Sequence, residues 1–242
     1  MRVLILSDIH ANCIALDAVL EAAGEVEATW CLGDVVGYGP QPNECVERLL
    51  AIDDLICLQG NHDAATVGDL PLDSFNPDAR TSLEWQQKTL DDAAIDFLKD
   101  RPRSTVQGNY TLVHASPRHP VLEYLLDAYT AAENFEYFDT EYCFVGHTHI
   151  PVIFKMTDST KRVSLRSPEA GMAIELQPRQ IINPGSVGQP RDRDPRAAFA
   201  ILDTETNEYH YQRVEYDVKA VQRLMEAAKL PKRHIERLET GW

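Results

Sequence analysis

Short apolar runs alternate with segments of helical periodicity through the first part of the chain. The runs predict strands over 3–7, 28–33 and 55–59, and the periodic segments predict helices over about 12–23 and 42–51. Because strands and helices follow one another in turn, we expect parallel strands joined by crossover helices.

Further along, a helical segment over 77–99 gives way to a series of strands. These strands are predicted over 104–107, 110–114, 142–146, 151–156, 162–166, 172–176, 197–203 and 208–215. Gly108-Asn109 is a hairpin-type turn between the first two. A helix over about 217–229 stops before Pro231, and the tail through Trp242 can form another short helix. We find no linker or repeat, and expect one domain over 1–242 with a C-terminal helix and tail over about 217–242.

Composition indicates the size of the core, the location of the protein and the state of its cysteines. The 242 residues are 44% hydrophobic, which suffices for one well-buried core. The N-terminus opens directly into a strand, and no apolar segment is long enough to span a bilayer, so we expect a cytoplasmic protein without a membrane partner. The five cysteines are odd in number and show no CxxC spacing, which favours reduced core residues over disulfides or a thiolate metal site.

The formal net charge of −15 disfavours broad contact with a nucleic-acid backbone, which depends on Lys and Arg. An anionic substrate would need local positive charge, which bound divalent ions supply. An acidic surface is also compatible with a high-salt habitat.

Polar motifs follow five of the apolar runs and supply carboxylate, imidazole and amide groups. They are Asp8-Ile9-His10, Gly33-Asp34, Gly60-Asn61-His62-Asp63, His114 and Gly146-His147-Thr148-His149. A pair of divalent metal ions needs these groups in about these proportions, so the motifs indicate metal-assisted hydrolysis of a phosphate ester.

The spacing within the motifs supports shared ligation. In an extended chain the side chains at i and i+2 point the same way, so Asp8 and His10 can reach one ion, and His147 and His149 can do likewise. Asp34 can bridge two ions with its two oxygens. Taken alone, each motif also fits a helix cap, a turn or a surface histidine.

The Gly60 motif offers three different groups. Asn61 presents an amide oxygen to a metal, His62 can donate or accept a proton, and Asp63 could fix the tautomer of His62. An ordinary turn after a buried strand is the alternative. A lone His114 would be a structural residue, but five of the eight histidines share this position after a strand.

These motifs in this order resemble the calcineurin-like metallophosphoesterase superfamily, in particular its small bacterial and archaeal phosphoesterases, and Asn183-Pro184-Gly185-Ser186 adds a further match. The resemblance implies an α/β fold, a four-layer α/β/β/α sandwich of two mixed sheets. It also implies a binuclear site, with Asp8, His10 and His149 on one ion, Asn61, His114 and His147 on the other, and Asp34 bridging.

The implied reaction is in-line attack by a hydroxide that bridges the two ions, with His62 as proton donor or phosphate-binding group. A nitrogen and oxygen ligand set without thiolate accepts Mn, Fe, Ni, Co or Zn, and we expect Mn. No protein nucleophile is required. Ser7 and Ser116 lack the context of a hydrolase nucleophile and are expected to be structural.

One departure bears on the substrate. Protein phosphatases and diadenosine tetraphosphatases of the superfamily carry an Arg shortly after Gly-Asp, but residues 33–40 contain none, and residue 59 is Gln where protein phosphatases have Arg. Substitute contacts could come from Tyr38, Arg191 or Arg193, although an ordinary solvated loop is the alternative. Pro184-Gly185 suits a type II turn that shapes the site wall.

Three functions fit the sequence. The leading one is a hydrolase of small phosphomonoesters or phosphodiesters, with nucleotides among the candidates. A nuclease on the same fold is disfavoured by the net charge and by the lack of a basic, aromatic-interleaved segment. A non-catalytic scaffold, like the retromer subunit of this superfamily, is disfavoured because all seven candidate ligands and His62 are retained.

Overall fold

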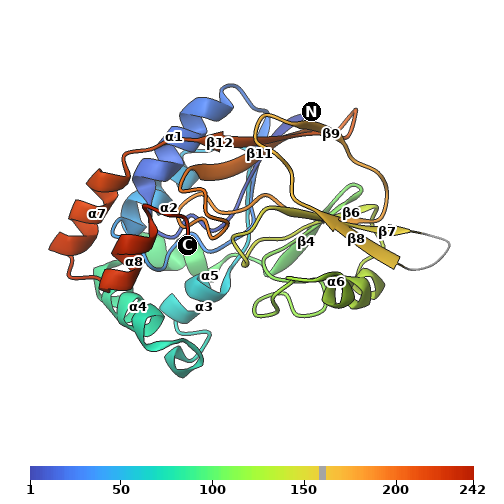
Figure 1. Cartoon of the computed structure of the whole chain (residues 1–242). Helices are drawn as coiled ribbons and strands as arrows, with labels where there is room; N and C mark the ends of the chain where they lie inside the picture. Colours follow the sequence, from blue (N-terminus) through green and yellow to red (C-terminus); the bar gives the residue numbers. More distant parts are fainter. Residues whose placement is uncertain (158–161) are drawn as a thin grey trace.

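The computed structural model describes residues 1–157 and 162–242, and it packs two mixed sheets against each other with helices on the outer sides (Figure 1). The first sheet contains β1 (Arg2–Leu6), β2 (Ala28–Cys31), β3 (Leu55–Cys57), β9 (Ala173–Glu175), β11 (Ala197–Asp203) and β12 (Glu208–Val214). The second contains β4 (Ser104–Gln107), β5 (Tyr110–Val113), β6 (Tyr142–Phe144), β7 (Val152–Thr157), β8 (Arg162–Arg166) and β10 (Gln180–Asn183). The strand orders are β3-β2-β1-β11-β12-β9 and β4-β5-β6-β10-β7-β8.

Helices cover the outer face of each sheet. The helices of the described ranges are α1 (Cys13–Ala23), α2 (Pro42–Leu50), α3 (Asn61–Thr66), α4 (Pro77–Thr89), α5 (Asp92–Lys99), α6 (Ala128–Asn134), α7 (Val218–Ala227) and α8 (Lys232–Arg237), with 3-10 turns η1 (Leu72–Ser74) and η2 (Phe135–Tyr137). In Figure 1, α1 and α2 lie along the first sheet, α6 lies against the second, and α7 and α8 pack at the far left. Within the described ranges, none of the helices combines the length and apolar character of a bilayer-spanning segment.

Alternation of side chains along the strands explains the layers. In β1, Val3 and Ile5 belong to the core between the two sheets, whereas Leu4 and Leu6 face α1 and α2. A third apolar layer, which includes Phe135 of η2, fills the space between the second sheet and α6. Three apolar layers require four layers of structure, so the predicted α/β/β/α architecture is confirmed.

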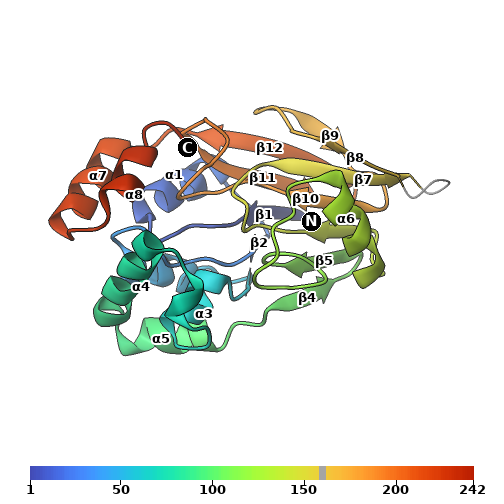
Figure 2. The ribbon, with the colours of Figure 1, turned by 60° about the horizontal axis from the view of Figure 1, so that its bottom comes forward.

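Parallel pairing gathers the motif loops at one edge. Strand β1 is parallel to β2 and β2 to β3, so the loops after these three strands emerge together. In the second sheet β5 is parallel to β6 and β6 to β10, so the loops after these strands also emerge together. Figure 2 shows the strands of both sheets after the molecule is turned by 60° about the horizontal axis. Every motif found in the sequence follows one of these six strands.

Several predicted elements have different bounds, and others were missed. The segment 77–99 is two helices because the Asp91 side chain accepts a hydrogen bond from Ala94 N and starts a new helix. Strand β10 was not predicted, since only Ile181 and Ile182 are apolar, although all four of its residues are buried. Helices α3 and α6 were also missed, because both are short.

The cysteines agree with the sequence analysis. Cys13, Cys31, Cys45, Cys57 and Cys143 are free, and all are buried. They lie in the apolar layers and do not contribute to any of the clusters of metal-binding side chains among the described residues.

Candidate metal centre

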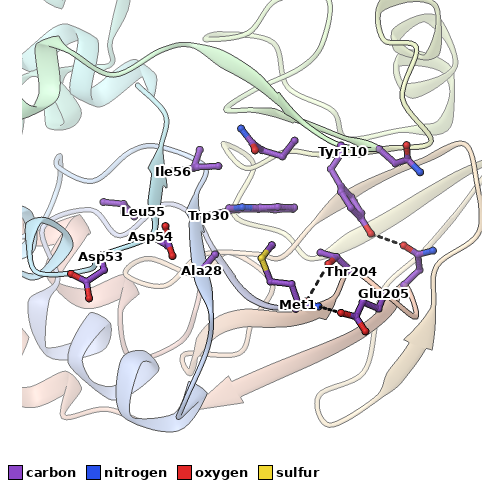
Figure 3. A pocket seen from close by; sticks show the side chains of 14 residues that line it. Met1, Ala28, Trp30, Asp53, Asp54, Leu55, Ile56, Tyr110, Thr204 and Glu205 are labelled. Atoms are coloured by element: carbon purple, nitrogen blue, oxygen red, sulfur yellow. Dashed lines mark hydrogen bonds and ion pairs between the residues drawn. The ribbon is translucent and has the colours of Figure 1, made fainter.

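A pocket of about 830 Å³ lies where β2, β3 and β5 begin, away from the motif loops. Figure 3 shows Trp30 between Ile56 and Tyr110, with Met1 and Glu205 at one side. Trp30 is only 2% exposed, and the Tyr110 hydroxyl donates to Asn207 Oδ1, so the two aromatic residues of the pocket are already engaged. It contains none of the candidate ligands.

The candidate ligands instead meet at the opposite ends of the strands, where all seven are buried. Two groups of donor atoms converge there. Asp8, His10, Asp34 and His149 form the first, and Asp34, His114 and His147 form the second. Asn61 joins the second group, because its Oδ1 lies 3.2 Å from His114 Nε2.

Asp34 lies between the two groups. Its Oδ2 is 3.6 Å from His10 Nε2 and 3.4 Å from His114 Nε2. Its Oδ1 accepts a hydrogen bond from the backbone N–H of His62, which fixes the carboxylate. One carboxylate oxygen therefore faces a nitrogen donor from each group.

Hydrogen bonds to carbonyl groups set the tautomers of three histidines. His10 Nδ1 lies 3.0 Å from Val36 O, His149 Nδ1 lies 2.6 Å from Gln189 O, and His114 Nδ1 lies 2.9 Å from Leu32 O. Because a carbonyl oxygen only accepts, each Nδ1 must carry the hydrogen, and a neutral ring then keeps its lone pair on Nε2.

The resulting lone pairs face one another. His10 Nε2 and His149 Nε2 are 3.0 Å apart, and His149 Nε2 is 3.5 Å from Asp8 Oδ1. Two acceptors repel at this distance, whereas a cation held between them would bind both lone pairs. The buried His147 Nε2 has no hydrogen-bond partner among the described residues. These donors therefore fit a pair of divalent cations.

Burial controls the charge of this cluster. It lowers the pKa of His10 and His149, and with help from His114 it lowers the pKa of His147 to about 3. Burial also disfavours a charged His114, but Asp34 outweighs it and raises the pKa of His114 to about 9. His10, His147 and His149 are thus neutral, the form that binds metal ions, whereas His114 must release a proton when a metal ion binds.

The backbone at the ligands is left-handed. Asp8, His10, Asp34, His147 and His149 have φ values of 53°, 49°, 54°, 65° and 59°. Residues other than glycine rarely adopt this conformation, and it concentrates at functional sites. No motif spacing indicated these turns, so the extended i, i+2 geometry expected for Asp8 and His10 is wrong in detail, although the loops still bring both side chains together.

Two motif glycines allow the loops to approach closely. A Cβ atom on Gly60 would lie 2.1 Å from Asp34 Oδ1, and one on Gly146 would lie 1.9 Å from Ser7 Oγ. Neither distance is compatible with a side chain. The glycines that open these two motifs are therefore needed for contact between loops of different strands.

We expect Gly146→Ala to destabilise the protein by about 1–3 kcal/mol and to weaken metal binding, because the new methyl group forces the β1 and β6 loops apart. Ser7→Ala removes the closest atom, so the double variant should lose less stability than the sum of the two single variants. Urea denaturation of all four proteins measures this coupling. Strict additivity would show that the two loops do not press on each other.

His62 lies beside the candidate ligands. Its ring packs 4.9 Å from the ring of His10, 4.3 Å from that of Tyr38 and 5.1 Å from that of Phe75, measured between centroids. Its buried Nδ1 has no hydrogen-bond partner among the described residues, and burial lowers its pKa to about 4. This histidine is thus adjacent to the donor groups and has a free ring nitrogen.

Asp63 has a different role from the one expected. Its Oδ1 accepts from Val36 N and its Oδ2 from Gly60 N, both at 3.0 Å. The carboxylate therefore holds the Asp34 loop against the Gly60 loop, and these bonds do not set the tautomer of His62. A carboxylate next to a histidine in sequence was a misleading signal, because the two side chains of α3 point different ways.

The Asn183 turn does more than shape a wall. Asn183 Nδ2 donates to Gly146 O and to Thr148 Oγ1, and Ser186 Oγ donates to Asp8 O. The turn thereby braces the loops that carry Asp8, His147 and His149. Gln59 points elsewhere, since its Nε2 donates to Leu98 O and Asp69 Oδ2.

The expected substrate contacts separate into two places. Tyr38 is buried beside His10, and Arg191 Nη2 lies 3.3 Å from the Tyr38 hydroxyl. Arg193 instead stacks on the ring of Trp242, 4.7 Å from its centroid. Two further residues near the ligands were not predicted: Gln189, whose carbonyl orients His149, and Tyr124, whose ring lies 4.1 Å from that of His147. Neither residue belongs to a recognisable motif.

Comparisons with known proteins agree with this geometry. A family model for the calcineurin-like phosphoesterase superfamily domain matches residues 1–207. The chain is 37% identical to an uncharacterized protein of Methanocaldococcus jannaschii, over 98% of this chain and 97% of the relative.

Solved structures extend the similarity in three dimensions. A metallophosphoesterase from Sphaerobacter thermophilus is 44% identical with a TM-score of 0.91, covering 100% of this chain and 99% of that one. A hypothetical protein of Pyrococcus horikoshii OT3 shares the fold at 24% identity and a TM-score of 0.79, covering 100% and 98%. The chain therefore belongs to the calcineurin-like phosphoesterase superfamily, and its similarity to a metallophosphoesterase supports a metal-dependent hydrolytic enzyme.

Proposed function

We propose that the protein hydrolyses small phosphomonoesters or phosphodiesters with two divalent ions, Mn in the native enzyme, held by Asp8, His10 and His149 on one side and Asn61, His114 and His147 on the other. The observation that carries the proposal is the position of Asp34 Oδ2, within 3.6 Å of a histidine nitrogen from each group. When bound, the ions supply Lewis acidity and a water of lowered pKa.

The protein groups around the ions bind and orient the substrate. His62, whose ring lies 4.9 Å from that of His10, is suited to donate a proton to the leaving oxygen or a hydrogen bond to the phosphoryl group. Tyr38 is suited to bind an oxygen of the phosphate at the ions, and Arg191, hydrogen-bonded to the Tyr38 hydroxyl, is suited to contact the substrate from the neighbouring pocket. Asp63 acts as a positioning residue through Gly60 and Val36.

The substrate is proposed to be a small molecule, because a net charge of −15 opposes binding of a nucleic-acid backbone. A cytoplasmic location is part of the same proposal. It is supported by the five buried, unpaired thiols, which suit a reducing compartment.

Saturated with Mn, the purified protein should contain about two ions per chain, since seven ligands exceed what one ion of this class normally uses. Chelation should abolish hydrolysis of phosphoesters, and added Mn should restore it. Elemental analysis alongside the assay tests both points. Full activity with no more than one ion per chain would contradict the binuclear proposal.

A further inference from the structure

A second pocket, of about 560 Å³, lies beside the candidate metal centre and is rich in arginine. Arg191 contributes to it from the loop after the Asn183 turn, and Arg233 and Arg237 contribute from α8. Ile150, Thr240 and Trp242 also line it. We call the part formed by Arg191, Arg233 and Arg237 the arginine pocket.

Direct contacts join the arginine pocket to the metal centre. Arg191 reaches the Tyr38 hydroxyl, and the Tyr38 ring packs 4.6 Å from the ring of His10. Gln189 provides a second link. Its side-chain Oε1 accepts from Arg191 Nη2 at 2.9 Å and Arg237 Nη1 at 3.2 Å, while its carbonyl accepts from the ring of His149.

The guanidinium groups of the arginine pocket lack an acidic side chain as partner among the described residues, and Arg237 Nε donates to Trp242 O at 2.9 Å. Across the described residues, no carboxylate side chain forms an ion pair with Arg191, Arg233 or Arg237. Glu236, which also lines the cavity, lies 3.2 Å from Lys232 Nζ. In a chain with 38 acidic and 23 basic residues, three convergent arginines without an Asp or Glu partner are unexpected.

The positively charged guanidinium groups of the arginine pocket lie close enough to repel one another. Burial and the charge of Arg191 lower the pKa of Arg237 to about 10, with a further contribution from Arg233. The buried Nε of Arg191 has no hydrogen-bond partner among the described residues. An anion would relieve this repulsion and satisfy the free donors.

Helix α8 is held firmly in place. The buried His234 bonds through Nδ1 to Ser82 Oγ of α4, and its ring packs 4.6 Å from that of Tyr38. Ile235 and Leu238 pack in an apolar cluster with Val221 and Met225 of α7. Arg233 and Arg237 lie beyond residues 1–207, so they are outside the region that matches the family model.

We propose that the arginine pocket binds a second phosphate group of the substrate, so that the enzyme prefers molecules with one phosphate at the metal centre and another at Arg191, Arg233 and Arg237. The proposal rests on the proposed function for the identity of the first phosphate. Planar guanidinium groups match phosphate oxygens in pairs, which favours phosphate over a neutral group.

The first test measures binding without catalysis. Inorganic pyrophosphate is titrated into the metal-free protein by calorimetry, because metal ions would otherwise bind the probe. Arg233→Gln combined with Arg237→Gln should weaken binding on the order of tenfold or more. Arg223→Gln on the exposed face of α7 removes the same type of charge and should change the dissociation constant less than about twofold.

The second test compares substrates with Mn bound. A nucleoside 5′-monophosphate and the matching 3′,5′-bisphosphate differ by one phosphate. The kcat/KM for the bisphosphate divided by that for the monophosphate should fall about tenfold in Arg233→Gln. Thermal denaturation checks that the variants remain folded. Arg233 is exposed, so its replacement leaves the packing of α8 unchanged.

The outcomes separate the two proposals. Failure to hydrolyse any phosphoester, with pyrophosphate binding still lost in the double variant, rejects the proposed function and retains the arginine pocket as an anion site. Unchanged pyrophosphate binding in the double variant, or an equal loss in Arg223→Gln, overturns the arginine pocket whatever the enzyme hydrolyses.

Discussion

Asp34→Asn should remove most of the bound metal and lower the rate of hydrolysis on the order of 10³-fold. The substitution preserves the shape of the side chain and the oxygen that accepts from His62 N, but it removes the charge that faces both His10 and His114. Because one carboxylate serves both groups of ligands, its loss should affect both ions together. Elemental analysis and initial rates at saturating Mn measure the two effects.

His119→Ala is the matched control for Asp34→Asn. His119 is exposed and follows the β5 motif by five positions, but it does not belong to either cluster of metal-binding residues. The metal content and the hydrolysis rate of His119→Ala should stay close to those of the parent protein. If the two variants behaved alike, the assignment of the ligands would be wrong.

His62→Ala should keep both ions and lose about 10²- to 10⁴-fold in rate on esters with poor leaving groups, the usual range for general acid catalysis. A nitrophenolate leaves readily without a proton, whereas an alkoxide or ribose oxygen does not. The loss should therefore be small on p-nitrophenyl esters and large on alkyl or nucleoside esters. Parallel kinetics on the two kinds of ester measure the difference.

The substrate dependence is the decisive part of that experiment. Burial lowers the pKa of His62 to about 4 in the protein without ions or substrate, so a phosphate dianion is needed beside the ring to favour its protonated form. Equal losses on both esters would assign His62 to stabilising phosphoryl charge. His210→Ala, at a surface histidine paired with Glu208, serves as the control.

The fold was predictable where the pattern was long or repeated. Helix α1 begins one residue after its predicted start because Asn12 caps it, and α7 follows Asp217 in the same way. Strand β10 was not predicted because its two isoleucines are too few for a periodic pattern to be recognised. Its position between β6 and β7 is set by pairing with those strands. Short buried elements depend on their neighbours more than on their own residues.

The metal centre was predictable because its ligands come from short motifs placed after strands. The residues that surround and orient these ligands were not predictable. Gln189 acts through its carbonyl on His149 and through its side chain on two arginines, and nothing in its local sequence indicates either contact. Arg233 and Arg237 belong to a short helix whose position depends on His234 and Ser82, which are 152 residues apart in the chain.

The left-handed backbone at Asp8, His10, Asp34, His147 and His149 limits how this centre can be transplanted by design. Each such residue costs about 1–3 kcal/mol, which the surrounding packing must offset. A host sheet given the same side chains on ordinary strand ends would carry the ligand types but would aim them differently. A designer would therefore have to transfer the ligand-bearing loops together with Gly60, Gly146 and the Asn183 turn, because these residues hold the loops in place.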